Sequence, residues 1–306
     1  MVVAMANRIL AISSLLCVLA LPRPASAGPW ISGRWHFYLQ LRQSALFADQ
    51  RYDAAGNLQP IRVAVDGSGA TQTTSYRQAL TDLFAELGLG ARLALLIDFH
   101  GLSAIDQPLS SGARRAVGVS DLWLGLKLLL FDDELAAALQ VGITVPTGSP
   151  NGSVPLGPGD FREDFTLLVG KLFRHPHLFL SGEAGVRLRG SAVIPNPIAL
   201  GTREHVQYSH ELRYAGAFGY TLMTDRKAAD WFSFAIKLEG AYALSAPVED
   251  GLGVLDPVAG SYLKLGPEVT WAPTKHVQVS LGGHYFVAGR AMVAFGEVAL
   301  GLAVSR

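Results

Sequence analysis

The sequence predicts an all-β fold, a transmembrane antiparallel β-barrel of about twelve strands, from three observations. Apolar residues alternate with polar or small ones in runs of about ten residues, the length at which a tilted strand crosses a bilayer. Hydrophobic residues make up 50% of the chain, yet beyond the N-terminal region no apolar run approaches the roughly eighteen residues of a membrane-spanning helix. Long and short connections alternate between the runs, as in outer-membrane barrels.

Residues 1–27 have the pattern of a secretory signal peptide. Arg8 precedes the apolar run 9–21, and Ala25, Ser26 and Ala27 supply the small residues of a cleavage site. A membrane-anchor helix is the alternative, but the run is short for a span and two prolines follow it closely. We therefore predict a signal peptide over residues 1–27 and an outer-membrane β-barrel over residues 28–306.

Removal of the signal peptide leaves a nearly neutral chain without cysteine. Residues 1–27 contain two arginines and no acid, so 25 Lys and Arg less these two leaves 23, against 25 Asp and Glu. A net charge of about −2 argues against a nucleic-acid partner. The single cysteine, Cys17, lies within the signal peptide, so the mature chain cannot form a disulfide.

The clearest hairpin lies within residues 118–148. Every second residue from Leu122 to Leu130 is leucine, and a second alternating run of Leu, Ala, Val and Ile covers residues 135–145. A period of two places each apolar set on one face of a strand, and residues 131–134 form a turn between the runs. The leucine-rich faces are therefore expected to contact lipid, and the polar or small faces to line the lumen.

The other strands follow from the same alternation. The twelve expected strands are residues 33–47, 76–88, 93–97, 122–130, 135–145, 163–173, 178–189, 206–220, 231–245, 261–271, 277–288 and 291–304. Residues 76–88 also fit a helix, because their apolar residues recur at a spacing of three and four. We prefer the strand because another alternating run follows shortly after it.

The connections fall into two classes by length. Polar stretches rich in turn-forming residues cover residues 48–75, 101–117, 146–162, 190–205 and 246–260, and the intervening turns are short. Outer-membrane barrels have short periplasmic turns and long outer loops, so both chain ends are expected in the periplasm. A soluble β-sandwich, the alternative, gives no reason for this segregation. The aromatic residues near the short turns are expected to form an interfacial girdle: Phe131, Phe173, Tyr220, Trp231 and Trp271.

The chain also resembles a known family. The residues that carry the resemblance are GVSDLWLGLKLLLF at 118–131, LAAALQVGITVPTG at 135–148 and GEAGVRLRG at 182–190. They are similar to the MetA-pathway of phenol degradation family, whose members resemble hydrocarbon and fatty-acid transporters of Gram-negative outer membranes. The resemblance covers roughly residue 88 to the C-terminus and implies transport of hydrophobic or aromatic solutes. One departure is the chain end, Ser305-Arg306, where such barrels have an aromatic residue; a degenerate signal and a substitute role for Phe295 are the alternatives.

Polar and charged residues opposite the apolar faces define the candidate site. In a barrel they point into the lumen, where ionisable groups mark solute pathways. The expected lumen lining is Lys127, Gln140, Glu183, Arg187, Arg189, Glu211, Arg213, Lys237, Glu239, Lys264 and Glu268. One connected network is expected among Glu183, Arg187, Glu211, Arg213, Lys237 and Glu239. These charges either screen solutes in an open pore or pair and fill the interior, since twelve strands lie between filled and open barrel sizes.

Two residues oppose the alternation, and neither indicates catalysis. Lys171 and His210 fall on apolar faces; Lys171 lies near a turn, where its ammonium group can reach water. Barrel phospholipases carry a serine two residues from such a histidine, whereas this chain has Leu212. No nucleophile-elbow, zinc-protease or phosphate-loop motif occurs, so we predict no enzyme activity, cofactor or metal site.

The sequence therefore predicts an outer-membrane channel or transporter for small hydrophobic or aromatic solutes, with membrane lipid and the solute as its partners. The alternatives are a general diffusion pore for small polar solutes and a structural or adhesive barrel with a closed lumen. A wide lumen with unpaired charges favours the pore, and a lumen filled by side chains favours the structural barrel. An apolar cavity that opens towards lipid favours the hydrophobic transporter.

Overall fold

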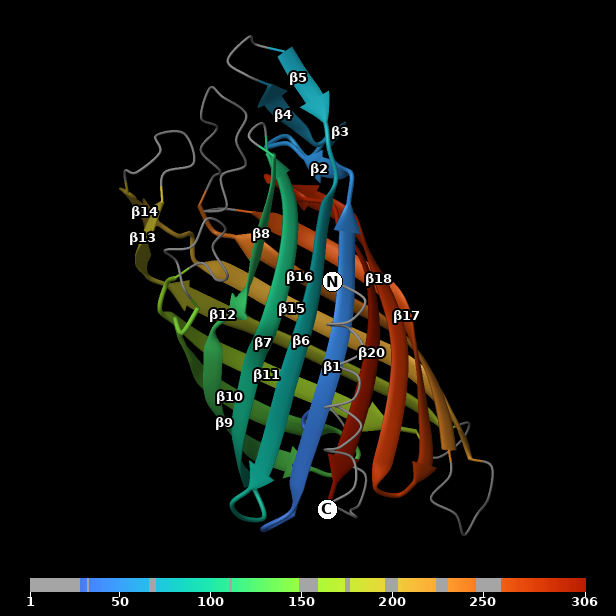
Figure 1. Cartoon of the computed structure of the whole chain (residues 1–306). Coiled ribbons are helices and arrows are strands. Elements are labelled where there is room, and N and C mark those ends of the chain that lie inside the picture. Colours follow the sequence, from blue (N-terminus) through green and yellow to red (C-terminus); the bar gives the residue numbers. More distant parts are fainter. Residues whose placement is uncertain are drawn as a thin grey trace.

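The computed structural model describes residues 28–31, 33–65, 70–109, 112–148, 159–173, 177–195, 203–223, 231–245 and 260–306. Within them the chain forms a closed antiparallel barrel of twelve strands, which confirms the predicted fold class (Figure 1). The barrel strands are β1 (Phe37–Ala48), β6 (Tyr76–Gly88), β7 (Leu93–Leu109), β9 (Leu122–Asp132), β10 (Ala136–Val145), β11 (Arg162–Leu172), β12 (Leu178–Arg189), β15 (Glu211–Met223), β16 (Trp231–Ala243), β17 (Ser261–Thr274), β18 (Val277–Arg290) and β20 (Gly296–Ser305).

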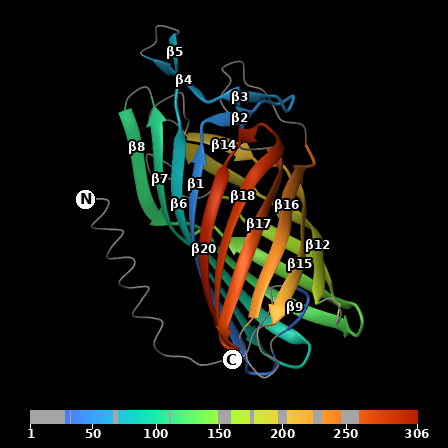
Figure 2. The same ribbon diagram turned by 90° about the vertical axis from the view of Figure 1, so that its right-hand side faces the viewer.

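The sheet closes on itself between its first and last strands. β1 pairs with β6 on one side and with β20 on the other, and both views place β20 beside β1 (Figure 2). At the lower end of this seam, Phe37 and Arg306 exchange two main-chain hydrogen bonds, of 3.1 and 2.8 Å. Closure pairs the main-chain groups of the edge strands, which is the condition for a sheet to cross a membrane.

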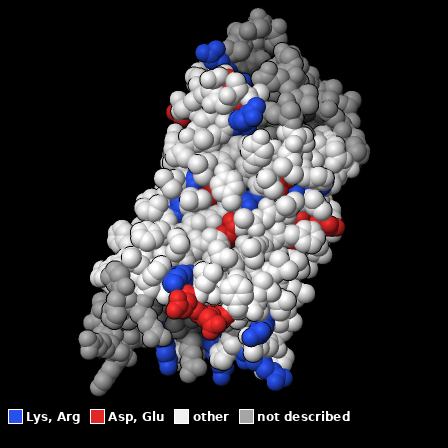
Figure 3. Space-filling model, turned by 180° about the vertical axis from the view of Figure 1, so that it is seen from behind, with Lys and Arg blue, Asp and Glu red and all other residues white. Residues whose placement is uncertain are grey.

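The apolar faces of the strands point outward and the polar faces inward. In β9, Leu126 and Leu128 are 43% and 44% exposed, whereas Lys127 between them is buried. Large apolar side chains are exposed in the same alternating way on β12, β15, β16, β18 and β20. Much of the rear surface is accordingly uncharged, with a few Lys, Arg, Asp and Glu at mid-height and others towards its upper and lower ends (Figure 3). This outer face is suited to lipid.

The lower end carries the short turns, the start of β1 and the C-terminus (Figure 1). Four of the five expected girdle residues, Phe131, Phe173, Tyr220 and Trp271, are exposed there. Trp271 stacks on Phe232, with 5.9 Å between ring centroids. The fifth, Trp231, lies on the inward-facing phase of β16, because it shares that phase with the buried Ser233 and Ala235. Lys171 pairs with Glu134 across the lower rim at 3.3 Å.

The prediction of a loop over residues 101–117 is wrong. β7 continues to Leu109, and β8 (Gly112–Val119) pairs with it as a hairpin. β8 and β9 keep one register against β7 and are interrupted only at Ser120 and Asp121. A hairpin satisfies its main chain by cross-strand pairing and needs no apolar face outside the hydrocarbon layer, so its composition resembled a loop.

Several predicted boundaries also differ. The strand expected over residues 206–220 begins at Glu211, because β14 (Arg203–Gln207) pairs instead with β13 (Ser191–Pro195) in an outer hairpin. His210 therefore precedes β15 and lies on no lipid-facing strand. Residues 33–36 form a turn before β1, and β19 (Met292–Val293) precedes β20. Parts of the predicted loops, residues 149–158, 196–202 and 246–259, lie outside the described residues.

The outer end is built from short strands. β2 (Gln50–Tyr52) pairs with β3 (Leu58–Pro60) and with β19, and β4 (Arg62–Val65) pairs with β5 (Ala70–Thr73) in a hairpin that projects from the barrel (Figure 1). In the β2–β3 turn, a hydrogen bond from the Asn57 main chain lowers the pKa of Asp53. The predicted signal peptide, residues 1–27, is not among the described residues. No helix in the described part is long and apolar enough to cross a membrane.

Candidate functional site

The barrel interior is the candidate functional site, and the N-terminal residues pack against its wall. Lys127 of β9 donates hydrogen bonds from Nζ to the carbonyl oxygens of Gly28 and Trp30, at 3.2 and 2.9 Å. A Cβ on Gly170 of β11 would lie 2.7 Å from the Trp30 ring and 2.9 Å from Pro29 Cγ. The absence of a side chain at position 170 therefore lets residues 28–31, which we name the inner segment, lie against the wall.

One side of the interior is covered. Lys127 Nζ also donates to Glu86 Oε2 of β6 at 2.6 Å, and the two side chains are only 4% and 5% exposed. Ala94 and Leu96 of β7 are buried as well. We name the interior faces of β6, β7 and β9 the covered side. Because a buried charge is stable only when paired, Lys127 and Glu86 depend on each other.

A glycine pair holds an indole flat against the wall above Lys127. Gly125 of β9 pairs directly with Gly142 of β10, and a Cβ on either would lie 2.2 Å from the Trp123 ring. Trp123 Nε1 donates to Asp164 Oδ2 at 2.9 Å. Arg187 in turn donates to both oxygens of Asp164, at 2.7 and 3.1 Å. The ring is thus fixed by lack of space behind it and by a charge-assisted hydrogen bond at its edge.

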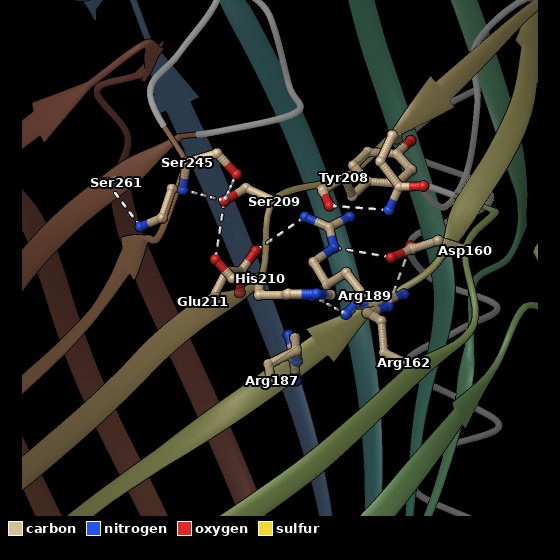
Figure 4. A network of polar contacts seen from close by, with 12 residues as sticks. Asp160, Arg162, Arg187, Arg189, Tyr208, Ser209, His210, Glu211, Ser245 and Ser261 are labelled. Carbon is tan, nitrogen blue, oxygen red and sulfur yellow. Dashed lines mark hydrogen bonds and ion pairs between the residues drawn. The ribbon is translucent and has the colours of Figure 1, made fainter.

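A chain of alternating acids and bases crosses the outer part of the interior (Figure 4). Arg162 pairs with Asp121 and with Asp160, and the second contact is 3.3 Å. Arg189 bonds Asp160 at 2.8 Å and Glu211 at 2.9 Å. Asp121 and Asp160 are almost fully buried. The chain therefore ties the break between β8 and β9 to the outer ends of β11, β12 and β15.

The same region fixes the start of the outer connections. The guanidinium carbon of Arg189 lies 4.0 Å from the centroid of the Tyr208 ring, and burial raises the pKa of Tyr208. The Arg189 main-chain N–H donates to His210 Nδ1 at 3.1 Å. Ser209 Oγ accepts a hydrogen bond from the Ser245 main chain at 2.9 Å (Figure 4). These contacts hold the connections that lead into β15 and out of β16.

A second charged group spans β15 to β20. Lys264 lies 3.0 Å from Glu239 and 3.6 Å from Glu297, and Arg213 lies 3.8 Å from Glu239. Glu297 also accepts hydrogen bonds from Arg42 and Ser44 of β1, at 2.5 and 3.1 Å. This group therefore crosses the seam where the barrel closes.

The other side of the interior is accessible. The side chains of Arg213 and Lys237 are each 36% exposed, and that of Glu239 is 35% exposed, although all three point into the barrel. Lys237 pairs with Glu268 at 2.6 Å. We name the interior faces of β12, β15 and β16 the open side. Exposed side chains inside a closed barrel face an internal solvent space.

Of the six charges expected to form one network, Arg213 and Glu239 contact each other, at 3.8 Å, and three others contact residues outside the six. Arg187 pairs with Asp164, Glu211 pairs with Arg189, and Lys237 pairs with Glu268. Within the described chain, Glu183 has no hydrogen bond or ion pair. Gln140 lies beside Lys127. The interior also contains charged residues that are absent from the predicted lining, although Glu86 follows the inward phase of its strand: Arg42, Glu86, Asp121, Asp160, Arg162, Asp164 and Glu297.

Aromatic side chains gather at the outer end. Ring centroids are 5.1 Å apart for Tyr76 and Phe295, 5.9 Å for Phe286 and Phe295, and 5.2 Å for Tyr262 and Phe286. We name these four residues the outer aromatic cluster. The Tyr262 hydroxyl donates to Glu239 Oε1 at 3.1 Å and so joins the cluster to the charged group. Phe295 thus lies at the end of β20 opposite the C-terminus.

No group of three or more His, Cys, Asp or Glu among the described residues is arranged to hold a metal ion. The described site therefore consists of ion pairs, aromatic rings and the inner segment, an arrangement that can bind or exclude solutes.

A closed barrel with an apolar outer face and a charged interior defines an outer-membrane β-barrel protein of a Gram-negative bacterium, which confirms the predicted location. The chain belongs to the MetA-pathway of phenol degradation family, whose model matches residues 65–296. This confirms the resemblance noted in the sequence.

One solved structure shows the same fold, and two others have a lower similarity. The COG4313 outer membrane channel from Pseudomonas putida F1 superposes with a TM-score of 0.62 at 15% identity, over 92% of this chain and 100% of that one. The NanC porin gives 0.49 at 9% identity, over 87% and 98% of the two chains. The CymD monoaromatic hydrocarbon channel gives 0.41 at 10% identity, over 89% and 88%. A comparison with curated protein sequences gives no match.

Proposed function

We propose that this protein is an outer-membrane channel for small hydrophobic or aromatic solutes. The observation that carries the proposal is the division of the interior into a covered side, with buried Lys127 and Glu86, and an open side, with exposed Arg213 and Lys237. A barrel filled by its own side chains would bury the charged residues of both sides. The internal space along the open side supports a passage beside the inner segment.

The outer aromatic cluster supports a hydrophobic or aromatic solute. Its four rings lie at the end of the barrel opposite the short turns, and Tyr262 and Phe295 are only partly buried. Aromatic faces attract planar apolar molecules through burial of apolar area and ring stacking. The family description, which refers to phenol degradation, agrees with this class of solute.

A diffusion pore for small polar solutes is the second candidate. It is favoured by the exposed charges of the open side, since water-filled pores are lined by charged side chains. The two candidates differ in which solute class crosses faster.

The test uses the purified protein in vesicles whose outer leaflet contains lipopolysaccharide, which slows passive entry of apolar solutes. We expect a monoaromatic solute to enter faster than a sugar of similar size. Replacement of two cluster rings, Tyr76→Leu with Phe295→Leu, should lower aromatic uptake several-fold. The matched control is Phe234→Leu, on the outer face of β16, where the ring is exposed to lipid.

Faster entry of the sugar would support the diffusion pore instead. Entry of neither solute, from a protein that migrates as a folded barrel, would support the structural barrel and contradict the proposal.

A further inference from the structure

Glu183 differs from every other carboxylate of the open side. It lies on the inward phase of β12, opposite Leu168 of β11 and Ala215 of β15, and it is exposed. Within the described residues its carboxylate has no hydrogen bond and no ion pair. By contrast, Glu239 and Glu268 are each paired with a lysine, at 3.0 and 2.6 Å.

The wall around Glu183 leaves room for a solute. Its inward-facing neighbours along β12 are Ser181 and Gly185, and across β15 they are Ala215 and Ala217. These side chains are short and uncharged. Arg213 lies next along the inward phase of β15, but it is in contact with Glu239, at 3.8 Å. Arg213 thus acts on the Glu183 carboxylate through space, without an ion-pair contact.

Among the described side chains, the interior contains more acids than bases. Eight inward-facing bases have described side chains: Arg42, Lys127, Arg162, Arg187, Arg189, Arg213, Lys237 and Lys264. Eleven inward-facing acids have described side chains: Asp82, Glu86, Asp98, Asp121, Asp160, Asp164, Glu183, Glu211, Glu239, Glu268 and Glu297. Each base of the open side contacts a carboxylate: Arg187 contacts Asp164, Arg189 contacts Asp160 and Glu211, Arg213 contacts Glu239, and Lys237 contacts Glu268. Among the described residues, Glu183 is the acid of this face whose charge is offset by no contacting base.

We propose that Glu183 gives the passage a preference for cations, both inorganic cations and the ammonium groups of organic solutes. The inference rests on the proposed function, because it needs an open passage. A solute that crosses the open side passes a carboxylate whose charge is not cancelled by a contacting base. Such a charge raises the local concentration of cations and lowers that of anions, most strongly in a narrow space with walls of low polarity.

The experiment measures the reversal potential of the reconstituted protein in planar bilayers under a potassium chloride gradient. The wild type should prefer potassium to chloride. Glu183→Gln should lower the permeability ratio by up to about fivefold, the effect of one unit charge about 4 Å away in water. Glu163→Gln is the matched control, because Glu163 lies on the outward phase of β11 and should leave the ratio unchanged.

A second measurement uses block by an organic ammonium ion, tetramethylammonium, added to the same bilayers. Glu183→Gln should weaken the block and Glu163→Gln should not. If the wild type and Glu183→Gln both carry current, with the same permeability ratio and the same block, the inference is overturned and the channel function stands. Absence of current from both the wild type and Lys127→Met, which frees the inner segment, would overturn the channel function and the inference together.

Discussion

At the residue scale, Lys127 links the barrel wall to the inner segment. Its ammonium group donates to Glu86 and to two carbonyl oxygens, of Gly28 and Trp30. All three N–H donors of the ammonium group are therefore used. The pairing also stabilises the Glu86 carboxylate, because a buried charge is costly when it is not paired. Lys127 stabilises both the wall and the position of residues 28–31.

Replacement Lys127→Met should destabilise the barrel by about 3–5 kcal/mol, because it removes the ammonium group that pairs with the buried Glu86 carboxylate. Urea unfolding in lipid vesicles measures this change. Ionic conductance should rise as the inner segment loses two hydrogen bonds. The double variant Lys127→Met with Glu86→Gln should regain most of the stability while conductance stays high. Equal stability of the single and double variants would contradict the assigned pairing.

Trp123 is the second residue whose surroundings determine its position. The Gly125 and Gly142 pair provides the recess for the ring, and Asp164 binds its N–H group. A methyl group in the recess has to displace the ring or the wall.

Gly142→Ala should therefore destabilise the protein by about 1–3 kcal/mol, the cost of overpacking. Displacement of the indole into the lumen should also increase quenching of Trp123 fluorescence by acrylamide, measured as the difference from a Trp123→Phe variant. Gly182→Ala is the control, since its Cβ would meet nothing closer than 3.7 Å. Equal effects of the two substitutions would show that the recess is not tight.

At the element scale, β9 shows how one strand serves two environments. Its outward leucines face lipid, while Trp123 and Lys127 carry the contacts of the covered side. A shift of one residue in register would exchange these sets, so the lipid and the buried ion pair specify the same register.

Leu124→Arg should lower the free energy of folding into bilayers by about 2–4 kcal/mol, since an arginine near the bilayer midplane has that cost. Folding yield into lipid vesicles at a range of urea concentrations provides the measurement. Ser181→Arg introduces the same side chain on the inward face of β12, beside Glu183, and should fold nearly as well as the wild type. Comparable losses in both variants would reverse the assignment of faces.

At the scale of the whole molecule, the short turns, the start of β1 and the C-terminus lie at one end of the barrel (Figure 1). The outer hairpins and the β2–β3–β19 sheet lie at the other. Outer-membrane barrels place their short turns in the periplasm.

A cysteine at Asn57, in the exposed β2–β3 turn, should therefore react with a membrane-impermeant maleimide on intact cells. A cysteine at Asp133, in the β9–β10 turn, should react only after the outer membrane is permeabilised. The reverse pattern would mean that the barrel is inserted in the opposite orientation. Position 151, an equivalent site in the next outer connection, lies outside the described residues.

The class of fold, the approximate number of strands and the face of each strand that meets lipid could all be predicted from local patterns in the sequence. It could do so because alternation is a local property: neighbouring side chains of a strand point to opposite faces whatever the strand pairs with. The leucines of β9 and the inward charges of β12, β15 and β16 are examples.

Contacts between distant segments determine which charges meet and what covers the interior, and these contacts could not be predicted from local patterns. Arg42 and Glu297 are 255 residues apart and meet because β1 and β20 close the barrel. Lys127 binds the inner segment, which has no alternation to reveal its place. Which inward acid a base pairs with depends on the register between strands. The β7–β8 hairpin depends on strand pairing outside the membrane. These are relations between distant segments, and no local pattern encodes them.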